Sequence, residues 1–211
     1  MRAPFLILLF ILWLAPGAAP AAAFDGAVGW AADTPGGRGG AILRVTSLAA
    51  DGPGSLRAAL EAKGPRIVVF EVGGVIDLGR TTLSIEEPFL TIAGQTAPSP
   101  GITIIRGGLD IKTHDVVVRH IRIRTGVDGQ APRSGWEADA LSTVGAYNVI
   151  VDHCSMSWAL DENLSASGPR FTGQTPGEWR RGTSHRITFS YNILAEGIAH
   201  GSHPKGEHSK G

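Results

Sequence analysis

Residues 116–124 read Val-Val-Val-Arg-His-Ile-Arg-Ile-Arg, a β-branched run that alternates apolar residues with Arg toward its end and stops at Gly126. A run of this kind bounded by turn residues is typical of a β-strand. Further apolar, β-branched runs that end at Gly, Asp or Ser begin at Ile67, Leu90, Ile102, Val149 and Ile187. The sequence therefore predicts a succession of short strands.

Two architectures consist of many short strands: a sandwich or barrel, and a β-solenoid. The runs that begin at Ile67, Leu90, Val116, Val149 and Ile187 start 23, 26, 33 and 38 residues apart. Solenoid repeats are about 20–50 residues long, and their insertions form loops on one face. Polar insertions at residues 128–135 and 168–182 account for the longer intervals. Asn-Gly hairpin signals are missing between the runs. The pattern favours the solenoid.

One helix is predicted at residues 55–62. Ser55 is its expected N-cap, and Gly64-Pro65 is its expected stop. Its apolar side consists of Leu56, Ala59 and Leu60. A solenoid needs a cap on the open end of its hydrophobic stack, and we expect this short helix to cap the N-terminal end.

Composition narrows the class of protein. The 211 residues contain 19 basic and 19 acidic side chains, so no excess of positive charge points to nucleic acid. Abundant Val, Ile and Leu argue against disorder, and 29 Gly with 13 Pro argue against a helical bundle. The single cysteine, Cys154, excludes an intramolecular disulfide framework.

The N-terminal residues have the features of an export signal. A basic start is followed by an unbroken apolar run at residues 5–14 and by small residues that end in Ala-Ala-Ala at 21–23. This pattern predicts a secretory signal peptide over residues 1–23. The apolar run is shorter than the roughly 20 residues that span a bilayer. We expect a secreted or periplasmic domain at residues 24–211 with no membrane association after cleavage.

Longer motifs resemble the pectate lyase family. They are GGRGG (36–40), VTSLAADGPGSLRAAL (45–60), VVFEVGGVIDL (68–78), LTIAGQTAPSPG (90–101), VIVDHCSMSW (149–158), RITFSYNIL (186–194) and HSKG (208–211). The resemblance implies an all-β, right-handed parallel β-helix with the short helix as its N-terminal cap. It also implies a monomeric protein that cleaves polygalacturonate, the pectin backbone, by calcium-dependent β-elimination.

Three carboxylates of the expected β-helix are candidate calcium ligands. Glu137 and Asp139 lie two apart in an extended segment, so both side chains leave the same face. Asp161 follows about one coil later, and neighbouring coils stack about 4.8 Å apart. Ca²⁺ prefers several oxygen ligands. The resemblance implies that Glu137, Asp139 and Asp161 bind Ca²⁺, and the part of Glu162 stays open. Without the resemblance, a solvated acidic turn is the simpler interpretation.

The resemblance also implies a lysine that binds the substrate carboxylate and an arginine that acts as the base. Lys210 matches the lysine best, and Lys205 is the weaker candidate. The expected arginine lies beyond Gly211, and Arg180-Arg181 is interpreted as part of a solvated loop. The β-helix domain is accordingly expected to be incomplete at its C-terminus, and the 211-residue chain is expected to be inactive, or nearly so, as a lyase.

Other interpretations stay open. A β-helix that binds calcium and acidic polysaccharide without catalysis is the main alternative, and a pectin-degrading glycoside hydrolase on the same fold is another. Asp152-His153 is interpreted as structural, with both side chains bonding neighbouring turns. A zinc site is a weaker hypothesis because its candidate ligands are irregularly spaced: His200, His203, Glu207 and His208.

Overall fold

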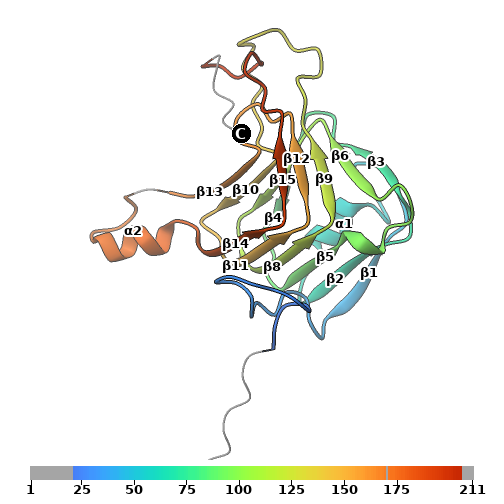
Figure 1. The fold of residues 1–211 in the computed structure, drawn as a ribbon, viewed down its shortest axis with the longest axis vertical. Helices are drawn as coiled ribbons and strands as arrows, with labels where there is room; N and C mark the ends of the chain where they lie inside the picture. The colour runs from blue at the N-terminus through green and yellow to red at the C-terminus, as the bar shows by residue number, and fades with distance from the viewer. Residues whose placement is uncertain (1–20, 170, 206–211) are drawn as a thin grey trace, which may run out of the picture.

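The computed structural model describes residues 21–169 and 171–205 and confirms the predicted parallel β-helix (Figure 1). Its strands form three parallel sheets. Sheet A contains β1 (Ala41–Val45), β2 (Arg66–Phe70), β5 (Leu90–Ala93), β8 (His114–Arg119), β11 (Tyr147–Asp152) and β14 (His185–Ser190). Sheet B contains β3 (Gly74–Asp77), β6 (Ile102–Ile105), β9 (Ile121–Arg124), β12 (Ser155–Ser157) and β15 (Ile193–Ala195). Sheet C contains β4 (Leu83–Ile85), β7 (Leu109–Ile111), β10 (Leu141–Val144) and β13 (Leu164–Ser167).

The run at 116–124, predicted as one strand, is two strands in different sheets. β8 ends at Arg119 and β9 begins at Ile121. His120 between them has a φ of +55°, which turns the chain through a corner of the β-helix. The sequence pattern does not reveal this single-residue corner, because Val118 before it and Ile121 after it are buried in the same core.

The core consists of stacked aliphatic side chains. Val68, Ile92, Val118 and Val151 occupy equivalent positions on four neighbouring strands of sheet A, and all four are fully buried. Each such side chain contributes about 1.5–3 kcal/mol when it leaves water. Parallel pairing in register therefore turns the repeated runs of the sequence into a continuous hydrophobic column.

The predicted cap is confirmed as α1 (Leu56–Glu61). The Ser55 hydroxyl accepts a hydrogen bond from the Ala58 N–H at 3.2 Å, as expected of an N-cap. The apolar side of α1 is buried in the main core through Leu56, Ala59 and Leu60. The helix therefore closes the N-terminal end of the hydrophobic column.

Arg66 at the start of β2 joins this cap to the coils below it. Its side chain is fully buried, and its guanidinium donates to five carbonyl oxygens. Two of them belong to the end of α1: Ala59, at 3.1 Å, and Leu60, at 2.6 Å. The others belong to Gly64, Glu87 and Pro88. Burial lowers the pKa of Arg66, and a cation at this end of a helix complements its dipole.

A second inter-coil network surrounds Asp152, which is buried at the end of β11. Its carboxylate accepts hydrogen bonds from Ser190 at 2.7 Å and from Arg119 at 3.1 Å, on the two neighbouring coils, and it lies 2.7 Å from the His153 ring nitrogen. Burial by itself would raise the pKa of Asp152, but the bonds to His153, Ser190 and Arg119 hold it below its ordinary value. This is the structural role that the sequence favours for Asp152.

The polar insertion at 168–182 differs from its prediction. It contains α2 (Pro176–Gly182), whose N-cap Thr175 forms a reciprocal capping box with Glu178. Arg180 and Arg181, expected in a solvated loop, lie in the last turn of this helix. Figure 1 shows α2 projecting away from the body of the β-helix. The sequence did not predict α2, because its capping box involves only Thr175 and Glu178 and lies within a polar, Gly-rich insertion.

The described N-terminal segment covers the outer face of sheet A. Ala31 packs against Val117 and Ile150, and the Arg119 guanidinium carbon lies 3.8 Å from the centre of the Phe24 ring. Most of the predicted signal peptide lies outside the described residues. Within the described part of the chain, no helix is long and apolar enough to cross a membrane.

Replacing Arg66 by Lys should destabilise the protein by about 3 kcal/mol, because an ammonium with three donors leaves buried carbonyl oxygens unpaired. Urea unfolding followed by circular dichroism measures this loss. Arg44→Lys is the matched control, since Arg44 is exposed and pairs with Glu71 on the surface. Equal stability of the two variants would contradict the role assigned to Arg66.

Asp152→Asn should show a stability loss that depends on pH. Because the folded-state pKa of Asp152 is depressed, its carboxylate stabilises the fold fully above the unfolded-state pKa, near 4, and loses this effect as pH falls through the lower folded-state value. The gap in unfolding free energy between wild type and variant should be largest near pH 7 and shrink below about pH 4. Asp33→Asn, at an exposed ion pair with Arg186, should show a small gap throughout.

Candidate cation site beside sheet C

The acidic residues lie where two neighbouring coils enter sheet C. Residues 137–140 lead into β10, and residues 160–163 lead into β13. Backbone hydrogen bonds join the two segments: Leu160 N–H to the Ala138 carbonyl at 3.1 Å, and Ala140 N–H to the Glu162 carbonyl at 3.0 Å. This pairing places Glu137 and Asp139 beside Asp161, as the coil spacing predicts.

Gly108, just before β7, supports the site from the other side. The Leu109 N–H donates to the Ala140 carbonyl at 2.9 Å. A Cβ on Gly108 would lie 2.1 Å from the Asp139 carbonyl oxygen, so no residue with a side chain fits without moving Asp139. The absent side chain at Gly108 therefore sets the position of the Asp139 backbone.

The Asp139 carboxylate is held by donors from the next coil and from its own. Oδ1 accepts from the Glu162 N–H at 2.9 Å. Oδ2 accepts from the Ser165 hydroxyl at 3.1 Å and from the Ser142 hydroxyl. These bonds orient Asp139 before any ligand arrives.

Asp139, Asp161 and Glu162 form one compact group of carboxylates. Each offers an oxygen, and the three oxygens lie within 4.8 Å of one another. Burial and repulsion from Asp139 and Asp161 raise the pKa of Glu162 to about 7. A hard cation relieves such repulsion, and an all-oxygen donor set suits Ca²⁺. The donors present therefore fit the implied ion.

A second group shares Asp161. His203 Nε2 lies 2.8 Å from Glu137 Oε2 and 3.8 Å from Asp161 Oδ2. The ligand atoms of Glu137, Asp161 and His203 lie within 4.8 Å of one another. In the described part of the chain, these two groups are the sets of three or more His, Cys, Asp or Glu side chains close enough to bind one metal ion.

The predicted residues thus meet, but in two groups. Glu137, Asp139 and Asp161 all line one groove of about 380 Å³, with Glu162 as a further wall residue. Asp139 clusters with Glu162, and Glu137 clusters with His203. Sequence reasoning considered His203 only as a weak zinc ligand, since nothing in its Gly-rich context indicates which coil it contacts.

The predicted substrate lysine, Lys210, lies outside the described residues, as do His208 and Glu207 of the zinc hypothesis. Lys205 is described, and its backbone N–H donates to His203 Nδ1 at 3.1 Å. Arginine does not occur among the described residues that line the groove.

The floor of the groove is a polar ladder on sheet C. Ser84, Asp110, Ser142 and Ser165 occupy the same register on four neighbouring strands. Burial raises the pKa of Asp110, which lies 3.5 Å from the Lys112 ammonium. Asp110, Ser142 and Ser165 of this ladder line the groove, and Ser84 lines the neighbouring cavity. The Ser142 and Ser165 hydroxyls donate to Asp139, and their oxygens can still accept hydrogen bonds from a ligand in the groove.

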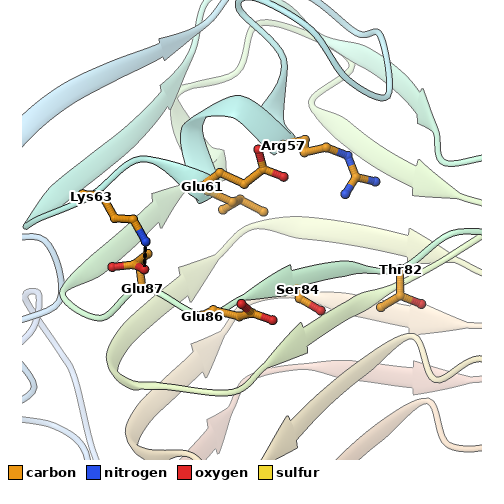
Figure 2. Close-up of a pocket in the computed structure, with 8 residues that line it drawn as sticks. Arg57, Glu61, Lys63, Thr82, Ser84, Glu86 and Glu87 are labelled. Atoms are coloured by element: carbon orange, nitrogen blue, oxygen red, sulfur yellow. Dashed lines mark hydrogen bonds and ion pairs between the residues drawn. The ribbon is translucent and has the colours of Figure 1, made fainter.

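A second cavity, of about 260 Å³, lies between α1 and β4 (Figure 2). Arg57, Glu61 and Lys63 face it from the α1 side, and Ser84 and Glu86 face it from the β4 side. Thr82 borders both cavities, so the groove continues toward the capping helix. Lys63 here forms an ion pair with Glu87, so this end carries mixed charge.

Three relatives found by comparison with known proteins are named pectate lyases. No protein-family model matches the chain. A probable pectate lyase C of Emericella nidulans is 37% identical over 196 residues, which are 92% of this chain and 41% of the relative. A probable pectate lyase C of Aspergillus oryzae is 41% identical over 83% of this chain and 37% of its own length. Pectate lyase 5 of Ambrosia artemisiifolia is 32% identical over 67% of this chain and 39% of its own length.

A solved structure supports the fold. The crystal structure of Jun a 1, the major allergen from cedar pollen, superposes with a TM-score of 0.58 at 23% identity and covers 81% of this chain and 49% of its own. The chain spans about two fifths of the length of the curated relatives it matches. Sequence similarity along most of its own length places the chain in the pectate lyase family.

Proposed function

We propose that the chain provides the cation site and the substrate groove of a calcium-dependent lyase that cleaves polygalacturonate by β-elimination. The observation that carries this proposal is the group of Asp139, Asp161 and Glu162, whose three oxygens converge in a groove lined with hydroxyl groups. The relatives, which are named pectate lyases, support the reaction class.

Asp139 and Asp161 would hold Ca²⁺, with Glu162 from the same group and Glu137 from its edge. When bound, the ion neutralises the uronate carboxylate and so makes the proton at C5 more acidic. The chain's own contribution is preorganisation. Hydrogen bonds from the Glu162 N–H and two serines orient Asp139 in advance, so little side-chain entropy is lost when the ion binds.

The hydroxyl ladder of sheet C would bind the sugar chain along the groove, and Asp110 would stay paired with Lys112. Lys210 is proposed to bind a uronate carboxylate, on the strength of its HSKG motif. The arginine base stays a prediction from the resemblance. Export by a signal peptide at residues 1–23, a β-helix domain at 24–211 and a monomeric, secreted or periplasmic state belong to the same proposal.

A second candidate is a β-helix that binds calcium and acidic polysaccharide without cleaving it. It is favoured by one observation: the described lining of the groove contains carboxylates and hydroxyls but no arginine. Both candidates require the same cation site, and they differ in whether a proton is removed at C5.

Asp139→Ala should weaken Ca²⁺ binding at least about tenfold, because it removes a ligand together with the acceptor that orders Glu162, Ser142 and Ser165. Isothermal titration calorimetry of the full chain measures the affinity. Asp33→Ala is the matched control, since Asp33 lies far from the groove and pairs with Arg186. Unchanged affinity in Asp139→Ala would refute this assignment.

Polygalacturonate should bind the full chain in the presence of calcium, and binding should fall when a chelator removes the ion or when Asp139 is replaced by Ala. Calorimetry measures the binding, and ultraviolet absorbance detects the unsaturated product of elimination. Product formation supports the lyase, whereas binding without product supports the second candidate. Binding that is indifferent to calcium would contradict both.

A further inference from the structure

Residues 201–205, which we call the strap, lie against the loop that carries Glu137. The Arg133 N–H donates to the Gly201 carbonyl at 3.2 Å, and the Gly135 N–H donates to the Ser202 carbonyl at 2.9 Å. The Ser202 hydroxyl donates to the Trp136 carbonyl at 2.7 Å. Ser202 and His203 are both buried. The strap therefore holds the backbone of residues 133–136 at three points, directly before Glu137.

His203 of the strap also contacts the Glu137 side chain. Its Nδ1 accepts a hydrogen bond from the Lys205 N–H at 3.1 Å, so the ring proton resides on Nε2. Nε2 then donates to Glu137 Oε2, 2.8 Å away.

We propose that His203 is a positioning residue that orients the Glu137 carboxylate toward the cation held by Asp161 and its neighbours. The inference rests on the proposed function. The Glu137 side chain is 52% exposed and belongs to a loop outside any strand, so the contact with His203 restricts its rotamers. The His203 bond engages Oε2 and leaves Oε1 for the ion. Hydrogen-bond partners of metal-ligating carboxylates typically contribute about 10–100-fold to metal affinity.

A competing role makes His203 itself a ligand. One imidazole and two carboxylates within 4.8 Å would suit a borderline cation such as Zn²⁺. Binding through Nε2 requires the ring proton to move to Nδ1, where it would face the Lys205 N–H. The observed hydrogen bond therefore favours the donor role.

Two substitutions separate the contacts of His203. In His203→Gln, the side-chain amide nitrogen reproduces the donor at the Nε2 position and keeps the bond to Glu137. In His203→Asn, the side-chain oxygen reproduces the acceptor at the Nδ1 position and keeps only the bond to Lys205. Calorimetry of the full chain with CaCl₂ should give near wild-type affinity for His203→Gln and about tenfold weaker affinity for His203→Asn.

Thermal unfolding without calcium serves as the control, and the two variants should have similar midpoints. Equal loss of calcium affinity in both, or greater loss in His203→Gln, would overturn the proposal. Zn²⁺ that binds wild type more tightly than Ca²⁺, with this preference lost in His203→Gln, would establish the ligand role instead. If Asp139→Ala weakens binding but neither His203 variant does, only this inference fails. If Asp139→Ala changes nothing, the cation site itself is wrong.

Discussion

Hydrogen bonding between successive coils is the constraint on which every other feature of this protein depends. Each coil pairs with the next in parallel register, so side chains at equivalent positions stack along the molecule. The same repeat builds the aliphatic column inside and the row of Ser84, Asp110, Ser142 and Ser165 outside. The carboxylates converge because Ala140 pairs with Glu162, and Leu160 with Ala138, across the coils that carry them.

This repetition explains why much of the fold could be predicted. The strand runs repeat at coil length, and the N-cap of α1 has a local signature at Ser55. The corner at His120 could not be predicted, because Val118 before it and Ile121 after it are buried in the same core. α2 was missed because its stability comes from one capping box within a polar insertion. The buried role of Arg66 could not be predicted either, because its partners are backbone carbonyl oxygens, which every residue type provides.

The candidate site was predictable to the same degree. Glu137, Asp139 and Asp161 meet because their spacing equals one coil. Their division into two groups was not predictable, because it depends on His203, about two coils further along the chain. The contact between residues 201–205 and the 133–137 loop is a tertiary contact, and the strand repeat does not predict it. The coil repeat thus brings the three carboxylates together, and the loop contacts divide them into two groups of candidate ligands.

The excursion that contains α2 leaves and rejoins the β-helix at neighbouring points. The Ser184 N–H donates to the Ser167 carbonyl at 3.0 Å, and the Ser184 hydroxyl donates to the same oxygen at 2.6 Å. The two ends of the insertion are therefore clasped together independently of what lies between them. Lengthening a loop with fixed ends costs little free energy. Evolution or protein engineering can therefore replace the segment between Ser167 and Ser184 without shifting the register of the coil that follows.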